Sequence, residues 1–231
     1  MTMRKILPVC ILIILVTSSL GWFSCQQQEE PQKRSGTSMN NEGWIDLFNG
    51  IDLSGWHLQK TDGPNGWKVE NSFYVNTPPS TDIMTDEEFY NFQLYVEFNV
   101  APGSNSGVYM RDKYEIQILD TYGKPTADNG CGSLYRRIPP ATNAARPAGE
   151  WQTYEVTFID QRLTVDHNET RILDNVDVGP KGTGAASDRE DGPGPLRLQG
   201  DHGLVSFRNV RIRPLSSEEA EKIQTVLKTE G

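Results

Sequence analysis

Residues 105–120 read N-S-G-V-Y-M-R-D-K-Y-E-I-Q-I-L-D and predict two short strands joined at Asp112-Lys113. Side chains of a strand alternate between its two faces. One face of this hairpin is apolar and carries Val108, Met110, Tyr114, Ile116 and Ile118. The other face carries Tyr109, Arg111, Glu115 and Gln117, with Asp120 just past the strand end. The apolar face is therefore expected in a core. The other is either a solvated surface or a site with hydrogen-bonding and titratable groups.

The composition of the 231-residue chain is that of an acidic globular protein. Hydrophobic residues make up 36% and charged residues 23%, so a packed core is feasible and wholesale disorder is not expected. The length allows one large all-β domain or two small ones. The net charge of -9 argues against a nucleic-acid partner, because phosphate-binding faces carry a basic excess. The cysteines are Cys10, Cys25 and Cys131, which after processing leave no pair for an intradomain disulfide.

The N-terminal region predicts export from the cytoplasm. Residues 1–24 have a charged start and an apolar run over 6–16, as in a signal peptide, and this run is short for a transmembrane span. Cys25 follows, and the pattern resembles a bacterial lipoprotein signal; a secretory signal cut nearby is the alternative. Residues 25–42 are polar and predict a lipidated tether. We therefore expect a cell-envelope lipoprotein, periplasmic or surface-exposed, bound to the membrane through its lipid.

Residues 43–215 predict a single all-β domain. Short apolar or alternating runs are bounded by Gly, Pro, Asn and Asp, and helical periodicity is almost absent. Besides the hairpin, the expected strands are 44–48, 67–70, 73–75, 94–100, 154–159, 163–165, 169–173, 196–199 and 205–213. Such a series predicts a β-sandwich or barrel.

Three other segments stand apart from the strand series. Residues 121–150 and 178–195 are long loops rich in small residues, and loops of this length are usually functional or mobile. In the tail, 216–231, Ser216 and Glu219 have the spacing of a capping box, which predicts a C-terminal helix.

Several short motifs of the domain resemble one family. In chain order they are 47–50 (L-F-N-G), 52–56 (D-L-S-G-W), 85–89 (T-D-E-E-F), 92–94 (F-Q-L), 105–111 (N-S-G-V-Y-M-R), 114–120 (Y-E-I-Q-I-L-D), 149–154 (G-E-W-Q-T-Y), 196–203 (L-R-L-Q-G-D-H-G) and 207–210 (F-R-N-V). Together they resemble the 3-keto-disaccharide hydrolase domain family over residues 43–215. The family often has one residue fewer between Gln199 and His202.

The resemblance implies a fold and an activity. The fold would be similar to concanavalin-like jelly rolls, with two antiparallel sheets and one concave face. Characterised members of the family cleave glycosides already oxidised to a ketone at C3 of the sugar. Such a ketone makes the hydrogen on C2 acidic, so a base can remove it and the oxygen on C1 can leave by elimination. Water then adds back. This chemistry needs a base, a donor for the enolate oxygen and an acid for the leaving oxygen.

The predicted catalytic residues are Glu115, His202 and Arg111. Glu115 would be the base if burial raises its pKa, and a solvated strand residue is the alternative. Arg111 offers a permanent cation for an oxyanion, and the alternative is a surface salt bridge. His202 has the intrinsic pKa of a general acid or base, although a lone histidine is more often structural. His57 and His167 are weaker candidates.

The predicted substrate-binding residues are Tyr109, Gln117, Asp120, Tyr135, Arg197 and Gln199. The two glutamines suit sugar hydroxyls, and Arg197 faces the same way as Gln199. Asp120 has a turn-capping alternative. Tyr109, Tyr135 and Trp151 would stack on a sugar ring or pack in the domain.

Ligand types allow a divalent metal on Glu115, Asp120 and His202, but no spaced motif supports one, and no cofactor is predicted with certainty. We expect a carbohydrate-active enzyme acting on oxidised disaccharides or glycosides. A non-catalytic glycan-binding module is the main alternative, and a protein-interaction domain is a third.

Overall fold

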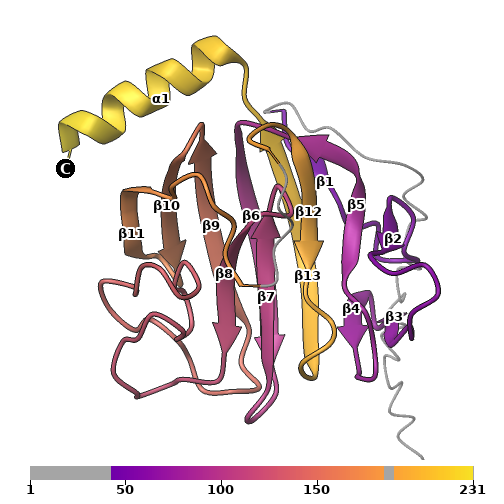
Figure 1. The fold of residues 1–231 in the computed structure, drawn as a ribbon. Coiled ribbons are helices and arrows are strands. Elements are labelled where there is room, and N and C mark those ends of the chain that lie inside the picture. Colours follow the sequence, from indigo (N-terminus) through magenta and orange to yellow (C-terminus); the bar gives the residue numbers. More distant parts are fainter. Residues whose placement is uncertain (1–42, 185–189, 231) are drawn as a thin grey trace, which may run out of the picture. The chain divides into compact units, whose positions relative to one another are not determined.

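The computed structural model describes residues 43–184 and 190–230, which contain thirteen strands and one helix (Figure 1). The predicted signal peptide and tether lie outside these described residues. Within the described residues, no helix has both the length and the apolar character that a membrane span requires.

The smaller sheet contains the hairpin on which the sequence analysis centred. Its strands, in spatial order, are β2 (Trp56–Leu58), β5 (Ile83–Phe89), β12 (Gly194–Leu198), β7 (Asn105–Met110) and β8 (Tyr114–Leu119). All neighbours are antiparallel. Strand β12, from the last part of the domain, therefore lies directly beside β7 (Figure 1).

The larger sheet forms the second layer. In spatial order it runs β11 (Thr170–Asp177), β10 (Arg162–His167), β9 (Gln152–Ile159), β6 (Phe92–Val100), β13 (Val205–Pro214), β4 (Phe73–Asn76) and β3 (Trp67–Glu70), with β1 (Ile45–Asp46) paired to β13. Each predicted strand overlaps an observed one, although several observed strands are longer than predicted, and β2 and β5 are additional. The prediction of two antiparallel sheets in a sandwich is confirmed.

Residues of both sheets share one hydrophobic core, as alternation predicts. The hairpin contributes its whole apolar face, and β6 contributes Phe92, Leu94, Val96, Phe98 and Val100. Ring contacts join the two layers: the centroids of Tyr114 and Phe158 are 5.5 Å apart, and those of Phe89 and Phe92 are 6.3 Å apart. The polar side chains that alternate with these residues on the smaller sheet are therefore turned away from the core.

Two buried polar side chains lie near the β9–β10 hairpin. His167 is the last residue of β10 and is fully buried, with Nε2 3.0 Å from Gln152 Oε1. Burial lowers its pKa to about 3. Cys131 is 2% exposed, with Sγ 3.2 Å from the hydroxyl of Tyr154. That hydroxyl donates to the carbonyl of Gln117 at 2.7 Å, which ties the core to β8.

Helix α1 (Ser217–Glu230) follows β13, and its predicted capping box is confirmed. The backbone N–H of Ser216 donates to Glu219 Oε2 at 2.9 Å, and the N–H of Glu219 donates to Ser216 Oγ at 3.3 Å. Ala220 and Gln224 are the buried residues among the described part of the helix.

Candidate functional site

The β7–β8 hairpin pairs the residues that the sequence placed on its polar face. Tyr109 lies opposite Glu115, and Gly107 lies opposite Gln117. On the other side of β7, Arg197 of β12 lies opposite Tyr109. Three neighbouring strands therefore bring an acid, a phenol and a guanidinium to one part of the smaller sheet.

A cavity of about 330 Å³ lies over this part of the sheet. It is lined by Asn105, Tyr109, Glu115, Gln117, Tyr135, Gly184, Gln199 and His202. All of these except Asn105 and Gly184 were predicted as site residues from the sequence. The structure brings these six predicted residues together, and their chemical roles stay predictions.

Glu115 is almost fully buried in the cavity wall, with 2% of its surface exposed. Burial raises its pKa to about 7, against the opposing effects of a hydrogen bond from Tyr109 and the charges of Arg197 and His202. With its amide nitrogen turned toward Glu115, Gln117 donates to Oε1 at 3.1 Å. A carboxyl with this pKa is partly ionised at neutral pH, which is the state that a general base requires.

Two glycines leave the space that the Glu115 carboxylate occupies. A Cβ on Gly107 would lie 2.5 Å from Oε1, and a Cβ on Gly184 would lie 2.5 Å from Oε2. Any side chain at either position would collide with the carboxylate. Backbone therefore packs against both oxygens, which explains how a side chain on a sheet face becomes almost fully buried.

Arg197 supports Tyr109 from beneath the cavity. Its guanidinium carbon lies 3.7 Å from the centroid of the Tyr109 ring. Its Nε is 3.1 Å from Asp112 Oδ1 and 3.6 Å from Asp82 Oδ2. Arg197 lies on the same side of the sheet as Tyr109, but its side chain is 1% exposed and is not among the residues lining the cavity, where it was predicted to bind substrate. It contributes charge and packing behind the wall.

The segment after β12 carries Gln199 and His202 to the cavity. The N–H of Gln199 donates to the carbonyl of Gly107 at 3.0 Å, and its Nε2 lies 3.4 Å from the hydroxyl of Tyr109. Asn76 donates to the carbonyl of Gly200 at 2.7 Å and so fixes the following turn. The His202 side chain is about half exposed at the mouth of the cavity, with Nδ1 hydrogen-bonded to Asp201.

The long loop 121–150 supplies Tyr135. Tyr135 lies beside the edge of β8, where its N–H donates to the carbonyl of Glu115 at 3.0 Å. Its half-buried ring lines the cavity, as predicted. Trp151 lies elsewhere, with its ring 5.0 Å from that of Phe73 and 4.1 Å from the guanidinium of Arg208. Of the predicted aromatics, Trp151 is thus outside the cavity.

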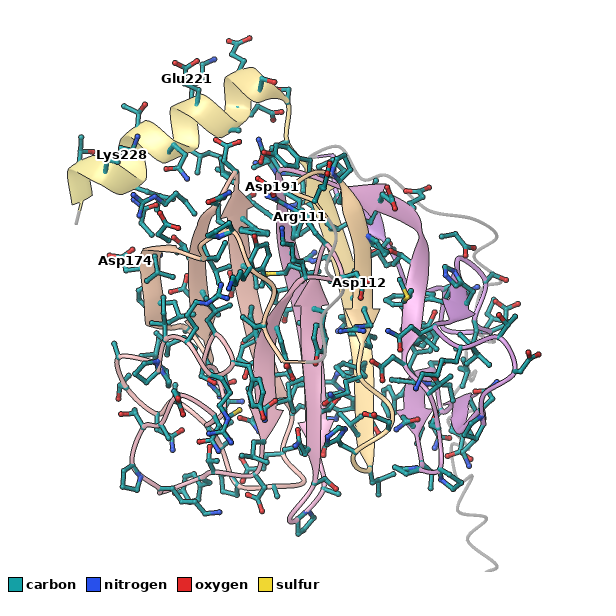
Figure 2. All side chains as sticks on the ribbon, viewed as in Figure 1. Arg111, Asp112, Asp174, Asp191, Glu221 and Lys228 are labelled. Atoms are coloured by element: carbon teal, nitrogen blue, oxygen red, sulfur yellow. The ribbon has the colours of Figure 1, made fainter. Side chains whose placement is uncertain are left out.

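The predicted position of Arg111 is wrong. The hairpin turns through three residues, 111–113, and Arg111 has a left-handed backbone with φ of 54°. Its guanidinium lies between the rings of Tyr90 and Phe158 and donates to the carbonyls of Tyr90 and Asp160 at 2.9 and 2.7 Å. Figure 2 shows Arg111 beside Asp191, with which it forms an ion pair at 3.3 Å. Arg111 does not line the cavity.

Asp120 is also away from the cavity. Its Oδ2 accepts a hydrogen bond of 2.9 Å from the N–H of Gly103, so it caps the turn before β7. The structure therefore agrees with the turn-capping alternative. Asp120 does not come together with Glu115 and His202 in a group that could bind a metal. Among the described residues, no group of three or more His, Cys, Asp or Glu side chains is placed to hold a metal.

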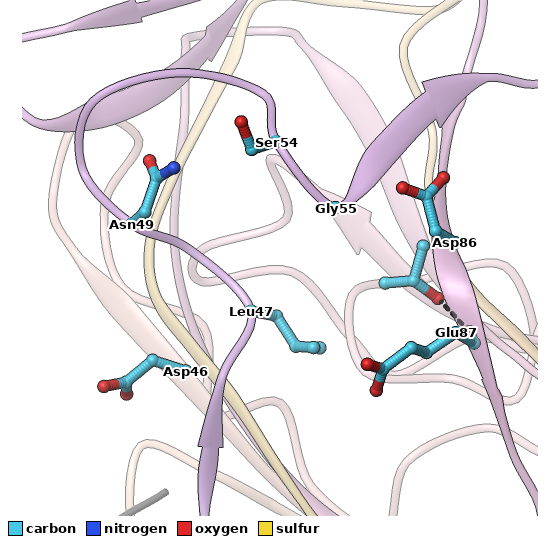
Figure 3. A pocket seen from close by; sticks show the side chains of 8 residues that line it. Asp46, Leu47, Asn49, Ser54, Gly55, Asp86 and Glu87 are labelled. Atoms are coloured by element: carbon cyan, nitrogen blue, oxygen red, sulfur yellow. Dashed lines mark hydrogen bonds between the residues drawn. The ribbon is translucent and has the colours of Figure 1, made fainter. Parts of the chain in front are cut away.

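A separate cavity of about 220 Å³ lies between the loop after β1 and strand β5 (Figure 3). Its lining includes Asp46, Asn49, Asp86 and Glu87. It contains none of the predicted site residues, so the cavity around Glu115 is the candidate site.

Residues 43–213 match the family model described as the 3-keto-alpha-glucoside-1,2-lyase-like domain. The chain belongs to this family. A curated member, the 3-keto-disaccharide hydrolase of Bacteroides thetaiotaomicron, is 25% identical over a match that covers 58% of each chain. This chain therefore spans less than two thirds of the length of that relative.

Solved structures similar to this 3-keto-alpha-glucoside-1,2-lyase-like domain support the fold. A crystal structure from Parabacteroides distasonis, described as a candidate glycosyl hydrolase, is 29% identical, with a TM-score of 0.66 over 75% of this chain and 84% of the other. A second such structure from the same organism is 24% identical, with a TM-score of 0.65 over 79% and 100%. The predicted jelly-roll class is confirmed.

Some residues of the site escaped the sequence analysis. Gly107 had a usable signal, because a glycine within a strand often marks a close approach of backbone. Asp82 carried no motif, and its carboxylate meets Arg197 only through the fold. Thr183 accepts a 2.7 Å hydrogen bond from the N–H of Glu115. It lies in a loop of small residues, where no strand or helix periodicity indicates which side chains meet.

Proposed function

We propose that this chain is a carbohydrate-active enzyme that cleaves glycosides carrying a ketone at C3 of the sugar. The observation that carries the proposal is the Glu115 carboxyl, which is buried in a polar cavity and has a pKa raised to about 7. A pure binding site has no need of such a group, whereas a base that removes a carbon-bound proton does. Membership of the family and the name of the curated relative support the same substrate class.

In the proposed reaction, Glu115 takes the proton from C2, and the electron pair of the C2–H bond forms an enolate with the C3 ketone. The pair then moves to form the C1–C2 double bond, and the bond from C1 to the glycosidic oxygen breaks. This gives a 2-hydroxyglycal that retains the ketone, together with the released alcohol. Addition of water, with oxygen to C1 and hydrogen to C2, completes net hydrolysis.

The neighbours of Glu115 suit the other steps. The enolate oxygen would accept from the hydroxyl of Tyr109 or the amide of Gln199, which lie together in the wall. Arg197, stacked on Tyr109, favours negative charge there. His202, exposed at the mouth, would protonate the leaving oxygen, and Gln117 and Tyr135 would contact the sugar. Arg111 and Asp120 have no part in this proposal.

The direct test is incubation with a 3-keto disaccharide and with its unoxidised parent, following free sugar and the 2-hydroxyglycal. We expect turnover of the keto compound alone. The change Glu115→Gln keeps the shape and removes the base, so kcat should fall by about a hundredfold to ten-thousandfold. The exposed residue Glu150 gives the control Glu150→Gln, which should leave kcat unchanged. Tight binding without turnover by the unmodified protein would favour the glycan-binding module instead.

Two further variants separate acid catalysis from binding. His202→Ala should lower kcat by a factor within the same range if the imidazole protonates the leaving group. Gln199→Ala should act mainly on KM, because an amide that holds hydroxyls does so in substrate and transition state alike. Near-normal kinetics for both variants and for Glu115→Gln would remove the basis of the site assignment.

We also propose that Cys25 is lipidated and that the domain is tethered to a membrane outside the cytoplasm. The support is the sequence pattern before and after this cysteine. Cys25→Ala should move the protein from the membrane fraction to the soluble fraction. Unchanged membrane association of the variant would refute the anchor.

A further inference from the structure

Directly after Tyr135, the chain makes a tight turn that points Arg137 toward a second loop, residues 178–184. The N–H of Arg137 donates to the carbonyl of Leu134 at 2.9 Å, and Arg136 has a left-handed backbone with φ of 56°. The turn leaves Tyr135 in the cavity wall and directs the Arg137 guanidinium to residues 178–184, which follow β11. We call residues 178–184 the strap.

Arg137 binds the strap through three backbone carbonyls. Its guanidinium donates to the carbonyls of Val178, Lys181 and Gly182, the last two at 2.8 and 3.1 Å. Charge-assisted bonds to neutral carbonyls are stronger than ordinary amide bonds, and the fork of an arginine can reach several acceptors at once. The hydroxyl of Tyr114 adds a 2.9 Å bond to the carbonyl of Gly179.

The far end of the strap lies on Glu115. The N–H of Thr183 donates to the carbonyl of Lys113 at 2.9 Å, and Thr183 Oγ1 accepts from the N–H of Glu115 at 2.7 Å. Gly184 then passes so close to the carboxylate that a Cβ there would lie 2.5 Å from Oε2 and 3.4 Å from the hydroxyl of Tyr109. The strap is therefore the cover on one side of the base.

We propose that Arg137 is a positioning residue that holds the strap against Glu115 and so keeps water from the carboxylate. We call the contact between Arg137 and the strap the clamp. The role of Glu115 as a base rests on the proposed function, but the clamp does not depend on it. The charged and titratable groups that face Glu115 are Tyr109 from β7, Arg197 from β12, Asp82 before β5 and His202 after β12. A change at Arg137 leaves all four in place, so its effect on Glu115 would come through the strap.

The direction in which the pKa of Glu115 changes when Arg137 is replaced distinguishes a clamp from a long-range effect of the arginine charge. Loss of a distant positive charge would raise the pKa of Glu115, because a cation favours the carboxylate. Loss of the clamp would admit water, which stabilises the carboxylate and lowers the pKa. Burial is the main cause of the raised value, so partial hydration should lower it by about one unit.

The experiment is a carbon-13 NMR titration of the Glu115 carboxyl in the full chain, without substrate. Arg137→Gln should lower the pKa of Glu115, and Arg137→Lys should lower it less, because an ammonium retains part of the donor set. Arg136→Gln is the matched control: Arg136 is an adjacent, exposed arginine with a 3.9 Å ion pair to Asp128 and, within the described residues, no hydrogen bond to the strap, so its loss should leave the pKa of Glu115 unchanged. An unchanged or raised pKa in Arg137→Gln would overturn the clamp.

If Arg137→Gln does not fold, Thr183→Val releases the other end of the strap and should also lower the pKa of Glu115. The titration needs no turnover, so it is independent of the proposed function. An inactive protein with the lowered pKa would support the clamp and refute the enzyme. In an active protein, the acid limb of the kcat/KM profile should move to lower pH together with the titration, and a limb that stays in place would count against the clamp.

Discussion

The Glu115 carboxylate is chemically useful and structurally costly. Its pKa is about 7 in the folded protein against an ordinary 4.5, so the folded state binds its proton more tightly than the unfolded state does. The stabilising contribution is complete below pH 4.5 and is lost as the pH rises through 7. The loss at pH 8 is on the order of 3 kcal/mol.

Glu115→Gln should therefore stabilise the domain at pH 8, because the amide never ionises, even though the same change lowers kcat. At pH 4 the gain should disappear. Urea unfolding at both pH values measures this, with the exposed Glu150→Gln as the control. Equal stability of Glu115→Gln and the unmodified protein at pH 8 would contradict the burial of a charged group at this position.

At the scale of single elements, the β7–β8 turn depends on Arg111. Its guanidinium fills the space between two rings and satisfies two backbone carbonyls. Removing such a group leaves two part-buried acceptors without this donor and takes away the packing between the rings, which typically costs about 2–4 kcal/mol in all.

Arg111→Met should thus lower the midpoint of thermal unfolding, while kcat per folded molecule stays near normal because Arg111 is outside the cavity. Arg136→Met is a fair control, since Arg136 is also a left-handed arginine in a turn but is exposed. A large loss of kcat at unchanged stability would show that Arg111 takes part in catalysis after all.

Helix α1 gives a smaller, local prediction. Ser216 and Glu219 each satisfy the backbone of the other, so Ser216→Ala should fray the first turn at a cost of about 1 kcal/mol. Hydrogen exchange of the first-turn amides should quicken, whereas the neighbouring change Ser217→Ala should leave it unaltered. Uniform exchange along the helix in both variants would show that the cap has no local effect.

The sequence predicted the elements well because strand alternation is local. Val108 and Glu115 could be assigned to opposite faces from residue spacing alone. Arg111 could not, because a three-residue turn with two left-handed residues moves it out of the strand, and nothing in R-D-K distinguishes that turn from a shorter one. The strap contacts of Arg137 were equally hidden, since they join segments about forty residues apart in the chain.

At the scale of the whole molecule, we expect His167 to make the domain less stable in acid. It packs against the rings of Phe98 and Tyr154, and within the described part of the chain its Nδ1 has no hydrogen-bond partner. Its folded pKa of about 3 is below the ordinary 6.5, so the unfolded state binds the proton more tightly. Stability is fully present above pH 6.5 and is lost toward pH 3, by on the order of 4 kcal/mol.

His167→Gln should flatten this part of the stability curve, since an amide does not titrate. His57→Gln, at an exposed histidine bonded to Asp86, is the control and should keep the acid sensitivity. Denaturant unfolding between pH 3 and pH 7 measures both. The same slope in His167→Gln as in the unmodified protein would assign acid sensitivity to other groups.

Because Cys131 is buried, the rate at which its thiol is alkylated reports how often the core opens. Its thiol is 2% exposed against Tyr154, and burial raises the pKa of the thiol, so an alkylating reagent can reach the thiolate only when the core opens. Its labelling rate, followed by peptide mass spectrometry, should rise with denaturant as steeply as global unfolding does, and Arg111→Met should raise it further. A denaturant-independent rate would mean that the loop carrying Cys131 opens alone. One native side chain thus allows the stability of every variant above to be measured in mixtures too complex for spectroscopy.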